Sequence, residues 1–100
     1  MTDAERFWQL ADELRAENPR VAEGTLMNGR CLRIDGDFLA LVDYKGSGLV
    51  VKLPRARVDA LVAEGIGKPF APAKKVFREW VSVADRGRWP ALLREAAARV

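Results

Sequence analysis

The chain has 100 residues, of which 49% are hydrophobic and 31% are charged. A chain of this length supports one hydrophobic core, so we expect a single domain over residues 1–100, and the composition argues against disorder. The sequence has no histidine and one cysteine, Cys31, which excludes an internal disulfide, thiol–imidazole nucleophiles and the usual zinc sites. We therefore expect no bound metal and no cofactor.

The net charge of +3 is distributed unevenly. The first 17 residues contain five acids and two arginines, whereas the stretch from Lys68 to Arg99 contains eight basic residues and three acids. An acidic beginning and a basic final third can bind each other, or each can bind a partner.

The N-terminus lacks the cationic lead of a secretory signal, and no apolar run approaches the length that spans a bilayer. With a single cysteine as well, the sequence predicts a cytoplasmic protein with no membrane association.

An amphipathic helix is predicted at the N-terminus. Thr2 or Asp3 can cap it, and it should end near Glu17 because Asn18-Pro19 follows. Trp8 should lie at the edge of the buried stripe. The stripe itself consists of apolar residues at three- and four-residue spacing, namely Phe7, Leu10, Ala11 and Leu14.

Four antiparallel strands are expected next, over residues 21–27, 30–34, 37–43 and 48–53. Asn28-Gly29 and Asp35-Gly36 favour tight primed turns because they tolerate positive φ angles, and residues 45–48 (KGSG) form the third connection. Residues 38–42 (FLALV) are apolar on both faces, which predicts a central strand or a surface covered by a partner. The chain's own helices or a second copy, as in a homodimer, can provide that cover.

A second helix is predicted over residues 54–64, with Pro54 in its first turn and Gly65 after its end. Arg55 and Arg57 lie near its start, where the helix dipole disfavours cations. An ordinary solvated face is the favoured interpretation for them, and the alternative is that an acidic neighbour or an anion holds them. The apolar stripe of this helix is Val58, Leu61 and Val62.

After a loop that contains Pro69 and Lys74-Lys75, residues 76–83 are predicted to return to the sheet as a strand. Alternation places Phe77, Val81 and Val83 on one face with Glu79, and Val76, Arg78, Trp80 and Ser82 on the other. A last helix should start near Trp89-Pro90 and reach Val100.

The expected architecture is therefore a two-layer α+β fold. Its elements follow the order α-β4-α-β-α, with three helices and a mainly antiparallel sheet of about five to six strands.

Three stretches carry a resemblance to a known family: residues 26–30 (LMNGR), 49–54 (LVVKLP) and 75–81 (KVFREWV). In order and spacing they resemble the N-terminal domain of TfoX/Sxy proteins, over nearly the whole chain. The resemblance implies a fold like that of the secretion-chaperone group. It also implies a role accessory to transcription regulation.

Three function classes follow from the residues. The first is an adaptor module that binds another protein; in the competing interpretation, a helix simply covers Trp80. The second is nucleic-acid binding, in which Trp80 or Trp89 stacks on bases; here the competing interpretation is an ordinary solvated basic face. The candidate partner-binding residues are Lys74, Lys75, Arg78, Trp80, Arg86 and Arg88.

The third class is an enzyme. Asp35 and Asp37 flank a turn glycine and are better explained as turn residues, and Cys31 has no histidine to activate it. No nucleophile can be paired with a base, so we expect no catalytic activity. The remaining polar candidates are Arg30, Asp43 and Tyr44, and Asp43 joins Asp35 and Asp37 as a possible carboxylate ligand for a metal.

Overall fold

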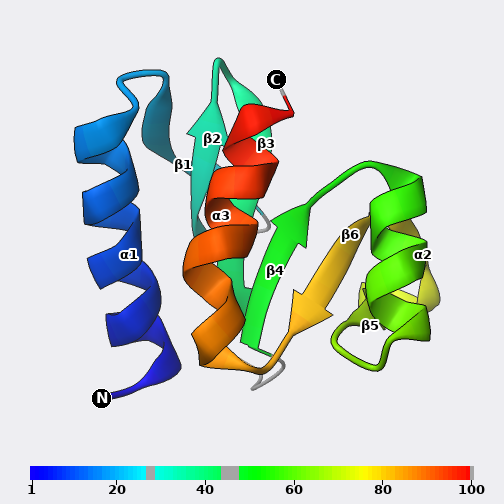
Figure 1. Cartoon of the computed structure of the whole chain (residues 1–100). Coiled ribbons are helices and arrows are strands. Elements are labelled where there is room, and N and C mark those ends of the chain that lie inside the picture. Colours follow the sequence, from blue (N-terminus) through cyan, green and yellow to red (C-terminus); the bar gives the residue numbers. More distant parts are fainter. Residues whose placement is uncertain (27–28, 44–47, 100) are drawn as a thin grey trace.

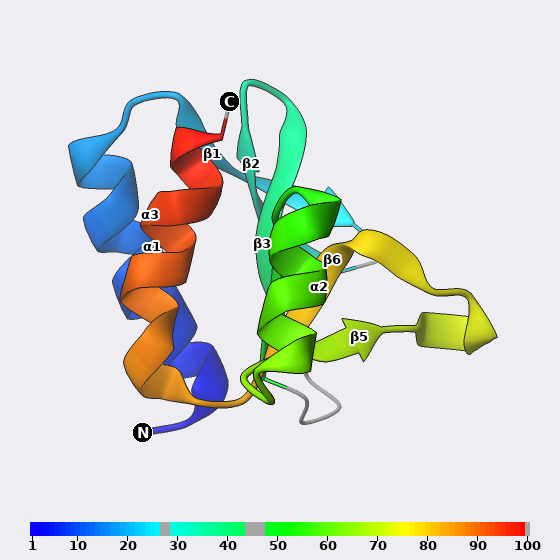
Figure 2. The same cartoon turned by 45° about the vertical axis from the view of Figure 1, so that its right-hand side comes forward.

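The computed structural model describes residues 1–26, 29–43 and 48–99, in which three α-helices lie on one face of a six-stranded sheet (Figures 1 and 2). The predicted α+β class is confirmed. The helices are α1 (Asp3–Glu17), α2 (Arg55–Ala63) and α3 (Trp89–Ala98), with two short 3₁₀ helices, η1 (Pro72–Lys74) and η2 (Arg86–Arg88). The strands are β1 (Val21–Leu26), β2 (Gly29–Ile34), β3 (Asp37–Asp43), β4 (Gly48–Lys52), β5 (Lys68–Phe70) and β6 (Phe77–Val83).

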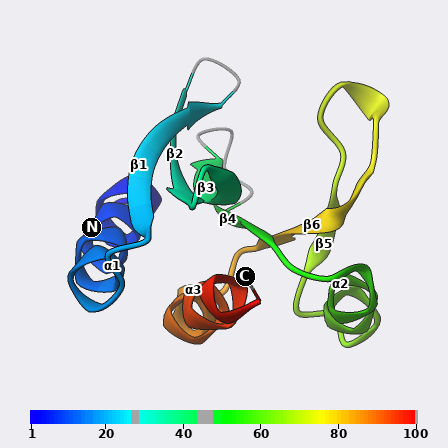
Figure 3. The ribbon, with the colours of Figure 1, turned by 90° about the horizontal axis from the view of Figure 1, so that it is seen from above.

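The sheet is bent into a trough. Its order is β1-β2-β3-β4-β6-β5, and every neighbouring pair is antiparallel. Viewed from above, its two outer parts rise away from the helices, which all lie against the outside of the trough (Figure 3). The two faces of the sheet therefore have different environments.

The main core lies between the helices and the sheet. The predicted stripe of α1 is buried, and a capping box between Thr2 and Glu5 starts this helix as expected. Trp8 is half-buried at the edge of this core, also as predicted. The buried residues of α3 are Trp89, Leu92, Leu93, Ala96 and Ala97.

A second, smaller core fills the inner face of the trough. Phe38 and Val50 are buried there by rings of the same chain, which answers what covers the second apolar face of β3. Cys31 belongs to this core, and burial raises the pKa of its thiol, so it packs as a small apolar group. The partly buried members are Leu26, Leu41, Phe77 and Trp80.

The turn predictions have mixed outcomes. Asp35 (φ 50°) and Gly36 (φ 84°) both have positive φ, as a primed turn requires. Gly29, in contrast, is the first residue of β2 opposite Leu26, so its assignment to a turn was wrong. Met27, Asn28, residues 44–47 and the predicted helix end at residue 100 lie outside the described residues.

The region before β6 departs from the prediction. Residues 68–70 were expected in a loop but form β5, an edge strand. Pro69 is tolerated there because one side of an edge strand makes no hydrogen bonds within the sheet. The β5–β6 register shifts between Pro69 opposite Val81 and Phe70 opposite Phe77. This irregularity breaks the alternation, so the predicted faces of β6 were wrong at its start.

Asp37 joins the start of β3 to two other elements. Its carboxylate accepts hydrogen bonds from Lys52 Nζ at 3.2 Å and from the Arg99 guanidinium at 3.3 Å. Arg99 also donates to the carbonyl of Lys52 at 3.1 Å and to that of Phe38 at 2.9 Å. Burial raises the pKa of Asp37, but the hydrogen bonds from Lys52 and Arg99 outweigh it and leave the pKa below its usual value.

Because the folded pKa lies below the unfolded one, this carboxylate stabilises the fold above the unfolded pKa of about 3.9, and the contribution is lost as the pH falls through the folded pKa. We expect Asp37→Asn to lower the free energy of unfolding at neutral pH by about 0.5–1 kcal/mol, since the pair is partly exposed. Urea titrations at neutral and acidic pH measure this, with Asp12→Asn as the exposed control. Equal stability of Asp37→Asn and the parent protein at neutral pH would contradict it.

Candidate functional site

The acidic α1 and part of the basic final third bind each other, one of the two outcomes that the charge pattern allowed. Arg86 Nε donates to the Asp3 carboxylate at 2.6 Å, and its Nη1 donates to the carbonyl of Met1 at 3.0 Å. Arg94 Nη2 donates to Glu17 at 3.0 Å, which holds the pKa of Glu17 below its usual value. Arg86, a predicted partner-binding residue, thus anchors the N-terminus.

Arg88 also lies apart from the other candidates. It follows the last residue of β6, whereas Arg78 lies near the first residue of that strand. Arg88 Nε lies 3.8 Å from Asp85 in the same short turn, and beside it a hollow of about 390 Å³ reaches Lys68 and Ser82. The six predicted residues therefore do not form one surface.

A projecting arm, residues 71–76 with η1, carries Lys74 and Lys75, and Arg78 lies beside it in β6. The arm reaches away from all helices at the outer end of the sheet (Figure 3). In the described part of the chain, Lys74, Lys75 and Arg78 have no ion pair or hydrogen bond from their side chains. Lys75 Nζ lies 5.7 Å from the centre of the Phe77 ring. This end of the molecule offers unneutralised positive charge to a partner.

Lys74 has a left-handed backbone, with φ 68°. This conformation costs a residue with a Cβ about 1–2 kcal/mol, and glycine adopts it freely. We expect Lys74→Gly to raise the free energy of unfolding by about 0.5–1 kcal/mol, as measured by urea denaturation.

Lys75→Gly is the matched control for this effect. Lys75 is extended, with φ −102° and ψ 122°, so the same loss of charge should there destabilise the protein through backbone entropy. Equal effects of the two replacements would contradict the account of Lys74.

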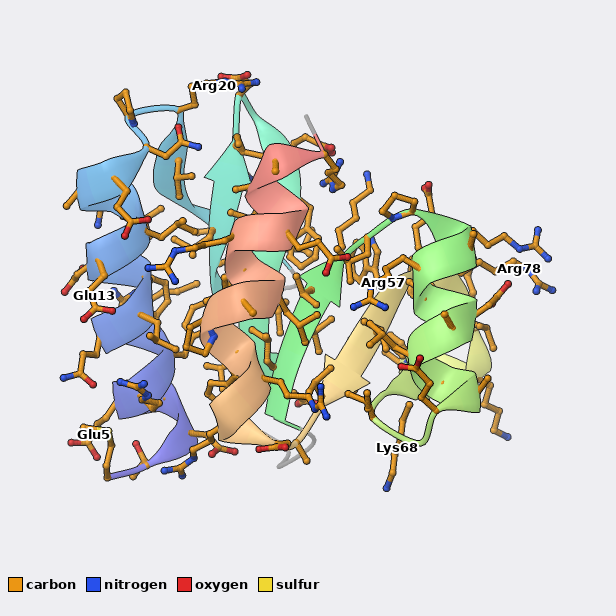
Figure 4. All side chains as sticks on the ribbon, in the orientation of Figure 1. Glu5, Glu13, Arg20, Arg57, Lys68 and Arg78 are labelled. Atoms are coloured by element: carbon orange, nitrogen blue, oxygen red, sulfur yellow. The ribbon has the colours of Figure 1, made fainter. Side chains whose placement is uncertain are left out.

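A groove separates α2 from the start of β6. It has a volume of about 290 Å³, and Val76 at its mouth is 51% exposed, a large value for an apolar side chain. Arg78 lines this groove and points outward beside α2 (Figure 4), so the prediction that it shares a face with Trp80 was wrong. The lining residues are Val58, Asp59, Val62, Ala63, Pro69, Val76, Phe77 and Arg78.

Trp80 is held by aromatic rings of its own chain. Its ring stacks on Phe38 at 4.3 Å, on Phe77 at 4.6 Å and on Phe70 at 5.7 Å between centroids. The interpretation that a helix covers Trp80 was wrong. Aromatic rings cover it instead, on the sheet face away from the helices. Trp80 is thus a partly buried member of the inner core.

The other tryptophans are occupied as well. Trp89 is fully buried, and its Nε1–H donates to the carbonyl of Val83 at 2.9 Å. Trp8 contacts Phe7 edge-on, and the Arg30 guanidinium lies 3.9 Å above its ring. Trp89 therefore has no exposed ring for base stacking, and the partly buried Trp80 is already stacked on three rings of its own chain.

The two cations at the start of α2, Arg55 and Arg57, differ in whether they have an acidic partner. Arg57 Nε donates to Glu95 of α3 at 2.8 Å and points between the two helices (Figure 4). For Arg57 the favoured interpretation, a solvated face, was wrong: the alternative, an acidic neighbour, is present, and its hydrogen bond raises the pKa of Arg57. Within the described residues, Arg55 has no such ion pair.

The residues considered for catalysis do not form one site, because Asp35 and Arg30 belong to different ion pairs. Asp35 pairs with Arg20 across the start of the sheet, and Arg30 donates to Glu23 at 2.8 Å. Tyr44 lies outside the described residues. Over residues 1–26, 29–43 and 48–99, no group of three acidic or sulfur ligands is close enough to hold a metal ion.

None of the helices in these ranges is both long and apolar enough to cross a membrane.

Comparisons with known proteins assign no family. The chain matches no protein-family model, and no curated protein and no solved structure is significantly similar to it.

Proposed function

We propose that this chain is a small, non-catalytic interaction module that binds another protein in the cytoplasm, in a setting accessory to transcription regulation. The TfoX-like motifs suggest the setting. The observation that carries the binding proposal is the outer end of the sheet, where the unpaired cations of the arm adjoin a groove with an exposed Val76. Exposed apolar surface rimmed by charge is typical of protein-binding sites.

Nucleic-acid association is the second candidate, and the same unpaired cations support it. It would depend on charge alone, because the tryptophans are occupied within the fold. Such binding weakens steeply with rising salt and discriminates little between sequences. A protein partner instead uses the groove as well as the charges.

Peptide selection tests the proposal. A library of random peptides is selected on the immobilised domain, and the binding of enriched peptides is compared between two double variants of equal charge change. Lys74→Glu with Arg78→Glu, the arm variant, alters one cation of the arm and the cation beside it in β6. Arg6→Glu with Arg15→Glu, the α1 variant, alters two cations of α1, of which Arg6 is half-buried and Arg15 is exposed. We expect the arm variant to lose at least about tenfold in affinity and the α1 variant to keep it.

Equal binding by both variants would overturn the proposal. Failure of any peptide to enrich, together with salt-sensitive binding of single-stranded DNA, would favour the second candidate.

A further inference from the structure

The geometry points to the kind of partner that binds here: we infer that the groove between α2 and β6 receives one large apolar side chain from an acidic protein segment, whose carboxylates bind the arm. This inference rests on the proposed function and specifies its ligand. The argument uses the shape of the groove, the placement of its charges and the surfaces that a second copy presents.

The groove is shaped for an apolar anchor. Val58 forms a buried wall at 4% exposure, Val62 and Phe77 are half-buried, and Pro69 lines the same space. Its volume of about 290 Å³ corresponds to roughly ten water molecules. Replacing that water with a leucine or phenylalanine side chain is favourable because six of the eight lining residues are apolar.

Charge fixes the direction of the partner. Arg78 forms one wall, and Lys75 directly precedes Val76 at the mouth. Asp59 forms part of the α2 wall and, among the described residues, has no ion pair, so it repels carboxylates. Glu79 follows Arg78 and is exposed, and it only partly offsets the arm. A bound acidic segment must therefore direct its carboxylates toward the arm and away from α2.

A second copy of the chain is a poor occupant. The acids of α1 are largely engaged, with Asp3 on Arg86 and Glu17 on Arg94. Over the described residues, the exposed large apolar side chains are Met1 and Val76 alone. Within residues 1–26, 29–43 and 48–99, no exposed surface combines a large apolar side chain with several free carboxylates. A different protein must supply that combination.

The test uses three defined probes and fluorescence anisotropy. The first is a twelve-residue peptide with one leucine flanked by aspartates and glutamates, the second replaces the leucine with serine, and the third is single-stranded oligothymidine. We expect the leucine peptide to bind at least about tenfold more tightly than the serine peptide.

Two variants locate the effect. Val76→Ser removes apolar contact without a change of charge and should abolish the preference for leucine. Asp59→Lys removes the repulsive acid and should tighten binding of the leucine peptide several-fold, a gain that misfolding cannot produce. Asp12→Lys on α1 makes the same charge change elsewhere and should leave the affinity within about twofold.

Equal binding of the two peptides, or no response to Val76→Ser and Asp59→Lys, would overturn the inference. If the arm variant still lost peptide binding in that case, the proposed function would survive without the groove. Tighter binding of oligothymidine than of either peptide would overturn both. A concentration-dependent dimer that Val76→Ser dissociates would assign the groove to a second copy instead.

Discussion

Replacing Trp89 with alanine is expected to lower the free energy of unfolding by about 3–5 kcal/mol, enough to leave much of the protein unfolded. The indole is fully buried where β6 passes through η2 into α3, so its removal leaves a cavity in the main core. The loss also leaves the carbonyl of Val83 without its 2.9 Å hydrogen bond. Urea denaturation followed by circular dichroism measures the change.

Trp89→Phe separates the two contributions. Phenylalanine keeps much of the apolar volume but cannot donate to the Val83 carbonyl, so we expect an intermediate loss of about 1–3 kcal/mol. A loss below about 1 kcal/mol for Trp89→Ala would contradict the assignment of this indole to the centre of the fold.

Replacing Trp80 with alanine is expected to cost about 2–3 kcal/mol, less than at Trp89 because the ring is only partly buried. The cost arises from the lost stacking on Phe38 and Phe77 and from the opened inner face of the trough. Chemical denaturation measures it at a temperature where the variant stays folded.

Trp80→Phe is the conservative control. It keeps an aromatic ring in the stack, so we expect a smaller loss of stability and unchanged affinity for the acidic leucine peptide. If Trp80→Ala instead kept its full stability and lost the peptide, Trp80 would be a contact residue and the assignment of binding to the arm and groove would be wrong.

The regular elements could be predicted because each one follows from local chemistry. Helix α1 follows from the three- and four-residue spacing of Phe7, Leu10 and Leu14 and from the cap at Thr2. The primed turn between β2 and β3 follows from Asp35-Gly36. The apolar character of both faces of β3 also predicted a covered second face, although its cover is aromatic side chains of the same chain.

Local patterns could not show β5 or the faces of β6. A three-residue strand that contains Pro69 is acceptable only at an edge, and edge position is a property of the whole sheet. The register shift beside Phe70 places Phe77 with Trp80, which strict alternation forbids. One signal was present in the sequence, since the three aromatic residues Phe70, Phe77 and Trp80 lie close together in the chain.

The candidate site could be predicted only in part, because ion pairing is decided by contacts between distant residues. Arg78 and Arg86 look alike in the sequence, yet Arg86 holds Asp3 from the far end of the chain and Arg78 lines the groove. Arg57 is a further case: its unfavourable place at a helix start left an acidic neighbour open as an alternative, but a solvated face was favoured, and only the fold shows Glu95 beside it. Among the predicted partner-binding residues, Lys74, Lys75 and Arg78 are the cations without a side-chain hydrogen bond or ion pair in the described part of the chain.

The most direct test of the central claim, that the arm and groove form the protein-binding surface, is a nuclear magnetic resonance titration of the ¹⁵N-labelled domain with the acidic leucine peptide. We predict saturable shifts of the backbone amides of Val62, Lys75 and Arg78, with the amides in the middle of α1 unmoved. Shifts confined to α1, or none at peptide concentrations approaching millimolar, would contradict the claim.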